Sequence, residues 1–346
     1  MTETFRRAEF GKGRGWPRLL TAVALVWGVG TSATAAAPIA NETGFSGQLT
    51  PLVGVIGSRS NFNVSGDQKR IDSLYELSSR EYRPVGGLLG RIDYTIVPRQ
   101  FAVHAGTPRS ALTEGELSLE IGAIYRLDGV GTLSAGVIPV SFAGNEVWAD
   151  PFVTGERREA TDVSRRGLRL GLAGIGGTGL SVDYRVFRRD VDEERSGEAL
   201  DLSAADRGRL ERDATEHRFQ LSYRLPVSEG FSLTPGLQYR RLDADGAANR
   251  GWLLRPQLTA SWRRDRLSLS LTGYYGVDRY DVRQPIYDEY RDSEQLGMVA
   301  GVSYAEPFGW SNWSVDAWGV WSESDSDIRF YDRQTSVFAV GLGYRF

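Results

Sequence analysis

The sequence predicts an all-β fold, a transmembrane antiparallel up-and-down β-barrel of about fourteen strands, and three observations carry this prediction. Apolar and polar residues alternate along almost the whole chain, and the links between the alternating runs are by turns short and long. Aromatic residues also gather at two levels of the apolar face. A soluble β-sandwich shows the same alternation, so the links and the aromatic residues decide between the two classes.

The composition excludes several classes of protein. The chain has 346 residues, and 41% of them are hydrophobic, which is too many for a disordered chain. It has no cysteine, so a disulfide framework and thiolate metal sites are excluded. Its mean hydropathy of -0.32 is too low for a bundle of transmembrane helices.

The first 35 residues are typical of a cleaved secretory signal peptide. Basic residues precede an apolar run over 19–27, and small residues follow it up to Ala37. We expect cleavage after Ala35, a short periplasmic N-terminal segment over 36–44 and the barrel over 45–346. The alternative is an uncleaved membrane anchor, for which the apolar run is too short. Cleavage removes five of 41 basic and two of 44 acidic residues, and the remaining net charge of -6 argues against a nucleic-acid partner.

The alternation has the period of a β-strand. In one clear run Leu119, Ile121 and Ala123 alternate with Glu120 and Gly122. Successive side chains of a strand point to opposite faces, so each such run has one apolar and one polar face. The predicted strands lie near 45–57, 85–97, 101–108, 115–127, 132–142, 164–174, 179–189, 215–225, 231–242, 252–263, 267–278, 293–304, 313–323 and 334–346.

The links favour a barrel of the outer-membrane type. Short links follow Val97, Leu127, Gly174, Leu225, Arg263 and Tyr304. Longer links follow Gly57, Phe142, Arg189, Leu242, Asp278 and Glu323. Short periplasmic turns and long extracellular loops are the rule for such barrels. The even number of strands places both termini on the side of the short turns.

Aromatic residues of the apolar face form two predicted girdles. The girdle near the short links contains Phe101, Tyr125, Tyr223, Phe231, Trp262, Tyr304, Trp313 and Tyr344. The girdle near the long loops contains Tyr184, Tyr239, Tyr275, Trp321 and Phe338. Amphipathic rings prefer the membrane–water interface, whereas a soluble core has no reason to sort them into two levels.

The C-terminal strand ends in an alternating run that closes on Phe346. This pattern resembles the assembly signal of bacterial outer-membrane proteins. It implies a Gram-negative outer membrane as the location and the barrel-assembly machinery as a partner, through Phe346. Outer-membrane lipid and lipopolysaccharide are further expected partners, and we expect a monomer.

Strand parity predicts which charged side chains line the lumen. Fourteen strands give a cylinder roughly 28 Å across, which leaves an aqueous lumen unless loops fold into it. The basic candidates are Arg91, Arg126, Arg169, Arg185, Arg218, Arg224, Arg240, Arg255 and Arg263. The acidic candidates are Asp93, Glu116, Glu120, Asp183, Glu216 and Asp316. Rings of arginine favour anions; the alternative is that these charges pair across neighbouring strands and merely hydrate the wall. The densest group is Arg218, Arg224, Arg240, Arg255 and Arg263.

The loops offer further candidate residues. Asp192 and Glu193 in one loop, and Asp325 and Asp327 in another, are possible oxygen ligands for calcium. Their spacing does not match an EF-hand, and solvation or divalent-bridged lipopolysaccharide explains them as well, so we predict no metal site and no cofactor. The segment from Trp148 through Asp150 to Phe152 either folds inward as a constriction or packs on neighbouring loops.

An enzyme is not expected. His104 falls on the inward parity and His217 on the lipid-facing parity, so the two histidines should not share a site. Neither a GxSxG nor an HExxH motif is present.

Several loop segments carry a resemblance to a known family. They are 148–155 with 161–164, 190–194 with Ser196-Gly197, 243–246, and 324–328 with 330–332. Together they resemble an uncharacterised group of proteobacterial outer-membrane proteins catalogued as domain of unknown function 2860. The resemblance spans about 44–346 and implies the location and the fold, and it carries no site residue.

The expected function is an outer-membrane channel for passive diffusion of small polar solutes, with anions among the candidates. One alternative is a loop-plugged barrel that binds a ligand, lipid or partner at the surface. A second is a barrel for uptake of hydrophobic solutes, which would need an apolar pocket and usually an N-terminal plug. About nine residues precede the first strand, which are too few for such a plug.

Overall fold

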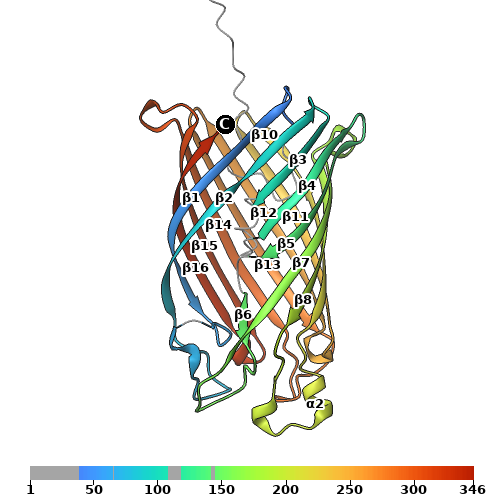
Figure 1. Cartoon of the computed structure of the whole chain (residues 1–346), viewed down its shortest axis with the longest axis vertical. Helices are drawn as coiled ribbons and strands as arrows, with labels where there is room; N and C mark the ends of the chain where they lie inside the picture. Colours follow the sequence, from blue (N-terminus) through green and yellow to red (C-terminus); the bar gives the residue numbers. More distant parts are fainter. Residues whose placement is uncertain (1–38, 65, 108–117, 142–144) are drawn as a thin grey trace, which may run out of the picture.

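The protein, described here by a computed structural model, is a closed antiparallel β-barrel (Figure 1). The structure describes residues 39–64, 66–107, 118–141 and 145–346. The predicted signal peptide, the predicted cleavage site and the candidate Glu116 lie outside these ranges. Among the described residues, no helix is long and apolar enough to cross a bilayer.

Fourteen strands form the wall, as the sequence predicts. They are β1 (Gly44–Arg59), β2 (Glu81–Val97), β3 (Phe101–Thr107), β4 (Ser118–Leu127), β5 (Gly131–Ser141), β7 (Ala160–Ala173), β8 (Leu180–Val191), β9 (Ala214–Tyr223), β11 (Phe231–Ala244), β12 (Gly251–Arg264), β13 (Leu267–Tyr280), β14 (Ser293–Ala305), β15 (Trp313–Ser326) and β16 (Arg333–Arg345). Two short strands accompany them: β6 (Glu146–Trp148) pairs with β7, and β10 (Leu225–Ser228) continues the course of β9 along β11.

Sequential strands pair with each other, and β1 pairs with both β2 and β16, which closes the sheet. The C-terminal residue belongs to this closure, because Phe346 and Gly47 exchange two backbone hydrogen bonds of 3.0 and 3.1 Å. The start of β1 and the end of β16 therefore lie at the end of the barrel that carries the short links, as predicted (Figure 1).

Helical turns occur only in the links of the described chain. The long loops contain η1 (Gly66–Lys69), η3 (Glu198–Leu200), α2 (Ala204–Gly208), η4 (Ala247–Asn249) and η6 (Arg329–Tyr331). The short links contain η2 (Ile175–Gly177) and η5 (Pro307–Gly309). We call the two ends of the barrel the short-link end and the long-loop end.

Several strands extend further toward the long-loop end than predicted. The strand β2 begins at Glu81 rather than near 85, β7 begins at Ala160 rather than near 164, and β15 ends at Ser326 rather than near 323. Most of the added residues are polar or charged, so apolar alternation stops before strand pairing stops. This is expected where a strand leaves the hydrocarbon layer, because water can solvate both of its faces there.

The outer face of the barrel is an exposed apolar band. Leu168 is 55% exposed and Phe338 is 60% exposed. At the short-link end Trp313 lies opposite Tyr344, with ring centroids 4.9 Å apart, and other members of the predicted girdle pair in the same way. A wall with an apolar outer face, an even number of strands and aromatic side chains at its rim is the architecture of a membrane-spanning barrel.

Candidate functional site

The register places the predicted lumen residues on the inner face. Each alternates with an exposed apolar side chain of the outer face, as Arg169 does with Leu168 and Leu170. This holds for the nine predicted arginines and, among the described residues, for the predicted acids Asp93, Glu120, Asp183, Glu216 and Asp316. The role of these residues in solute passage stays a prediction.

A charged network crosses the inner wall from β3 to β8. His104 Nε2 lies 3.0 Å from Glu120 Oε1, and the same carboxylate oxygen accepts a hydrogen bond of 3.1 Å from Arg169. Arg169 also donates to Asp183 at 2.6 Å, and Arg185 donates to the second oxygen of Asp183 at 2.8 Å. All five side chains are largely buried. In this part of the wall the charges pair with each other, which is the alternative to anion selection.

Two glycines make room for the network. A Cβ on Gly122 would lie 2.7 Å from the ring of His104 and closer still to the backbone oxygen of Ala135 on the next strand. A Cβ on Gly136 would lie 3.1 Å from the side chain of Glu120. Glycine at these inward positions therefore lets long charged side chains lie flat along the wall instead of projecting into the lumen.

Other predicted arginines are paired or stacked. Arg91 pairs with Asp93 at 2.6 Å, and Arg218 pairs with Glu216 at 2.6 Å. The guanidinium of Arg255 lies 4.6 Å from the ring centroid of Tyr274.

Some inner-wall charges were not predicted. Asp278 on β13 accepts a hydrogen bond of 2.5 Å from Arg240, so the partner of a predicted lumen arginine was missed. Toward the short-link end, Arg224 and Arg345 lie close enough to Arg263 to repel it. Arg224 is exposed on the inner face.

One sector of the inner wall is apolar. Leu52, Leu89, Trp318 and Ala339 pack together on the inner faces of β1, β2, β15 and β16, and Val85 lies against them. The lumen is therefore not a uniform charged ring. An apolar sector of this kind is one feature that uptake of hydrophobic solutes would require.

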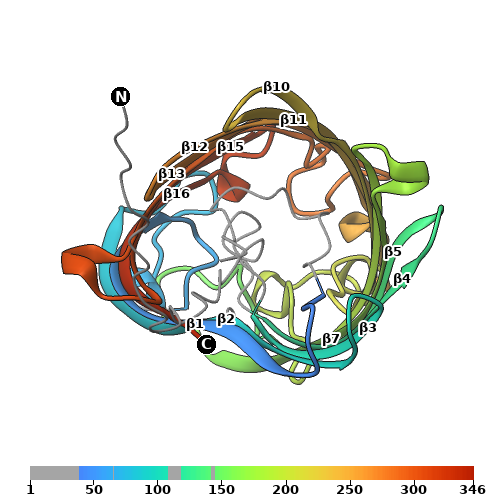
Figure 2. The same ribbon diagram turned by 90° about the horizontal axis from the view of Figure 1, so that it is seen from above.

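The long loops pack together into a hydrophobic cap over their end of the barrel (Figure 2). We define the cap by its buried residues, which are Ile71, Phe152, Leu210, Ala248, Ile328, Phe330 and Tyr331. Viewed along the barrel, described loop segments lie inside the ring of strands (Figure 2). The residues of the cap come from five different loops, so each loop is held by the others.

Phe330 is the centre of the cap and is 0% exposed. Its ring centroid lies 5.5 Å from those of Phe62, Phe152 and Tyr331, and 6.1 Å from that of Tyr287. The cap is thus packed like the core of a soluble domain, at a position where no periodic pattern in the sequence signals it.

The segment from Trp148 to Phe152 packs on neighbouring loops, as one of the two predicted alternatives has it; its role as a constriction stays a prediction. The carboxylate of Asp150 accepts hydrogen bonds of 2.9, 3.0 and 3.0 Å from the backbone N–H groups of Phe152, Gly197 and Ala199. Asp150 therefore joins two loops as a buried anchor.

Arg158 fastens the same segment to the loop after β1. Its guanidinium donates to the backbone oxygens of Asn61 at 2.8 Å and of Gln68, and lies 4.4 Å from the ring centroid of Trp148. Burial lowers the pKa of Arg158 to about 10, so the side chain is charged at neutral pH. A buried charge of this kind needs all of its hydrogen-bond partners, which ties it to the closed cap.

The remaining loop candidates lie at the surface. Asp192, Glu193, Asp325 and Asp327 are exposed, and Glu193 accepts a hydrogen bond of 2.6 Å from Arg195. In the described part of the chain, no three acidic or histidine side chains come together in a way that could hold a metal ion.

The two histidines lie on opposite faces of the wall. His104 points inward to Glu120, whereas Nδ1 of His217 lies 2.8 Å from the hydroxyl of Tyr184 on the outer face. They cannot act together on one substrate.

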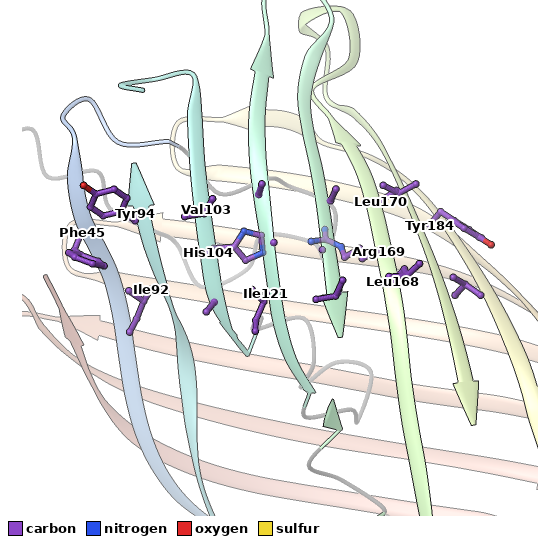
Figure 3. A pocket seen from close by; sticks show the side chains of 17 residues that line it. Phe45, Ile92, Tyr94, Val103, His104, Ile121, Leu168, Arg169, Leu170 and Tyr184 are labelled. Atoms are coloured by element: carbon purple, nitrogen blue, oxygen red, sulfur yellow. The ribbon is translucent and has the colours of Figure 1, made fainter. Parts of the chain in front are cut away.

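A hollow of about 880 Å³ lies on the outer face between β1 and β8 (Figure 3). Its floor contains the small side chains of Ala105, Ala123 and Ala135, and larger ones such as Tyr94 and Leu168 stand around it. The lining is almost entirely apolar and faces the membrane side, so hydrocarbon chains of lipid can fill it. It is separate from the lumen.

Three arginines near the cap were not predicted as candidate residues. Arg189 lies at the last inward position of the predicted strand over 179–189, Arg333 directly precedes the predicted strand over 334–346, and Arg291 lies in a loop. Parity could have found Arg189, but a loop residue such as Arg291 carries no periodic signal.

Several solved structures are similar to this chain at low sequence identity. The outer membrane channel DcaP of Acinetobacter baumannii has 11% identity and a TM-score of 0.42, with 90% of this chain and 100% of that chain covered. A Pseudomonas aeruginosa FadL homologue has 11% identity and a TM-score of 0.42, with 90% and 96% covered. An anion-selective porin from Comamonas acidovorans has 10% identity and a TM-score of 0.39, with 87% and 100% covered.

No curated protein matches the chain. The model of one family, described as a protein of unknown function (DUF2860), matches residues 44–345, which is the whole barrel. The chain therefore belongs to the DUF2860 family.

Proposed function

We propose that this protein is an outer-membrane channel through which small polar, preferentially anionic, solutes diffuse. The observation that carries the proposal is the excess of arginine over carboxylate among the described inner-face residues, with Arg333 near the cap and Arg224 near the short-link end both exposed. Charged wall residues replace part of a solute's hydration, and arginine does so for anions. The apolar outer face and the predicted signal peptide support the outer membrane as the location.

Reversal potentials in a salt gradient across a planar bilayer test this proposal. We expect anion selectivity for the refolded chain, and a shift toward cations in Arg255→Glu and in Arg224→Glu, since both side chains lie on the inner face. Arg266→Glu is the matched control, because Arg266 is exposed in the short link between β12 and β13. Equal shifts in all three variants, or cation selectivity of the wild type, would refute the proposal.

A second candidate function is a capped barrel that binds a ligand at the cell surface, and the packed cap favours it. The two candidates differ in what happens when the cap is loosened. A capped channel gains conductance steps in a variant with a disrupted cap, whereas a surface binder stays silent although its barrel remains folded. Heat-modifiable migration on gels reports the folded barrel in both cases.

A further inference from the structure

An arginine cluster lies directly beneath the cap, where the inner wall meets the loops. Its central members are Arg189 at the end of β8, Arg291 in the loop before β14, and Arg333 at the start of β16. Arg291 donates a hydrogen bond to Asn249, whose amide group donates to the backbone oxygens of Leu210 and Glu211; the backbone oxygen of the next residue, Arg212, accepts from Arg189. The guanidinium of Arg291 also lies 4.2 Å from the ring centroid of Tyr331, which is two residues before Arg333. The strands β8 and β16 are far apart around the wall, and Arg291 lies next to both the segment that holds Arg189 and the segment that leads into Arg333.

The positive charge of the cluster is incompletely neutralised. Nearby, Arg165 and Arg218 share Glu216, Arg240 pairs with Asp278, and Arg212 pairs with Glu194. Within the described ranges, no carboxylate lies at ion-pair distance from any of the three central arginines, which are Arg189, Arg291 and Arg333.

Arg291 is held in place by contacts that leave its charge unpaired. Its guanidinium lies 4.6 Å from the ring centroid of Tyr280 and 4.2 Å from that of Tyr331, and it donates a hydrogen bond of 3.0 Å to Asn249 Oδ1. Burial raises the pKa of Tyr331, so this ring stays neutral. Arg189 is held similarly, by a hydrogen bond of 2.9 Å to the backbone oxygen of Arg212.

Arg333 is the open member of the cluster. It is exposed although it lies on the inner face, opposite Ser324 of β15, so its side chain faces water in the mouth of the barrel. The nearby carboxylate of Asp278 is already paired with Arg240 at 2.5 Å. Like charges held this close destabilise a fold unless something of the opposite charge joins them.

We propose that Arg189, Arg291 and Arg333 form a binding site for a compact oxyanion that carries two or more negative charges, such as a phosphate or pyrophosphate group. Guanidinium groups bind such oxyanions through paired, charge-assisted hydrogen bonds, and several converging cations select a multivalent anion over chloride. The site lies inside the cap, so its ligand is a solute in the mouth and not a lipid headgroup in the membrane. This inference deepens the proposed function, since it names a class of solute that the channel would admit.

Binding of pyrophosphate to the folded barrel in detergent, measured by isothermal titration calorimetry in a chloride buffer, tests the site without requiring conduction. We expect saturable binding to the wild type, weakened about 10- to 100-fold by Arg333→Gln and by Arg291→Gln. Arg266→Gln is the matched control, because it removes an exposed arginine in the short link between β12 and β13 at the opposite end and should leave the affinity unchanged. Inorganic phosphate and succinate, compared in the same assay, distinguish phosphate from carboxylate ligands.

The stability of Arg333→Gln separates a binding role from a structural one. Among the described residues, this guanidinium makes no hydrogen bond or ion pair, so its removal should leave the heat-modification temperature unchanged or raise it while binding is lost. A lowered temperature with unchanged binding would overturn the inference, as would wild-type protein that binds no pyrophosphate in chloride. A barrel that conducts anions but binds no pyrophosphate refutes the site alone, and one that binds but does not conduct refutes only the channel.

Discussion

Replacing Phe330 by alanine should open the cap and leave the barrel intact. The Phe330 side chain is fully buried among four aromatic rings. Three of these rings come from other loops, and the fourth belongs to the neighbouring residue Tyr331. Truncating a buried phenylalanine to alanine costs about 3–5 kcal/mol. The strands of the wall are paired independently of this ring, so the loss falls on the cap. Because each 1.4 kcal/mol is a factor of ten, the population of open caps should rise by about two to three orders of magnitude.

Trypsin cleavage of the loops measures that population, since proteolysis follows the open state when opening and closing are fast. The loops carry Arg209 and Arg283 as cleavage sites. We expect Phe330→Ala to be cut at least 100-fold faster than the wild type and to show larger or more frequent conductance steps. Phe338→Ala is the matched control, because the same truncation on the outer face of β16 removes a ring that is 60% exposed. Equal cleavage rates in Phe330→Ala and Phe338→Ala would show that the loops are not closed by this packing.

Three further predictions concern the cap anchor, the outer face and the terminal strand. Asp150→Ala leaves three backbone N–H groups without their acceptor and should destabilise the cap by about 2–4 kcal/mol, seen as faster amide hydrogen exchange at Gly197 and Ala199. Leu168→Arg places a charge on the membrane face and should destabilise the barrel by about 2–4 kcal/mol in a lipid refolding titration; an unchanged midpoint would mean that this position does not face lipid. Deleting Phe346 removes two backbone hydrogen bonds of the closure and the terminal assembly signal, so unfolded chain should accumulate in the periplasm, whereas normal surface levels would clear Phe346 of that role.

The fold was predictable because a membrane imposes a regular demand on every strand. Each wall strand must present apolar side chains outward at alternate positions, so the period of two persists through all fourteen. The prediction missed the ends of strands that extend beyond the membrane, such as the start of β2 at Glu81 and the end of β15 at Ser326. Beyond the hydrocarbon layer, pairing continues through the backbone and leaves no trace in side-chain polarity.

The site was less predictable because partners on the inner wall come from distant parts of the chain. Parity identified Arg169 and Asp183 as inward residues, but not that they bind each other. It missed Asp278, which neutralises Arg240, so it could not tell a paired arginine from an unpaired one. The cap escaped prediction for a related reason, since Phe330 and Phe152 lie in loops without periodicity and meet only in three dimensions.

Tyr331 belongs to both the cap and the arginine cluster, and this shared residue links the two. The ring of Tyr331 packs against Phe330 in the cap, and the guanidinium of Arg291 lies 4.2 Å from the centroid of the same ring. An anion that binds Arg291 and Arg333 relieves their repulsion only while the loop that carries Arg291 keeps its place against Tyr331, so binding should favour the closed cap. Coupling of this kind is reciprocal. Pyrophosphate should therefore slow tryptic cleavage of the wild-type loops, and loosening the cap by Phe330→Ala should weaken pyrophosphate binding in the same proportion. If pyrophosphate protected the loops of Arg333→Gln as well as it protects those of the wild type, the protection would come from elsewhere on the protein.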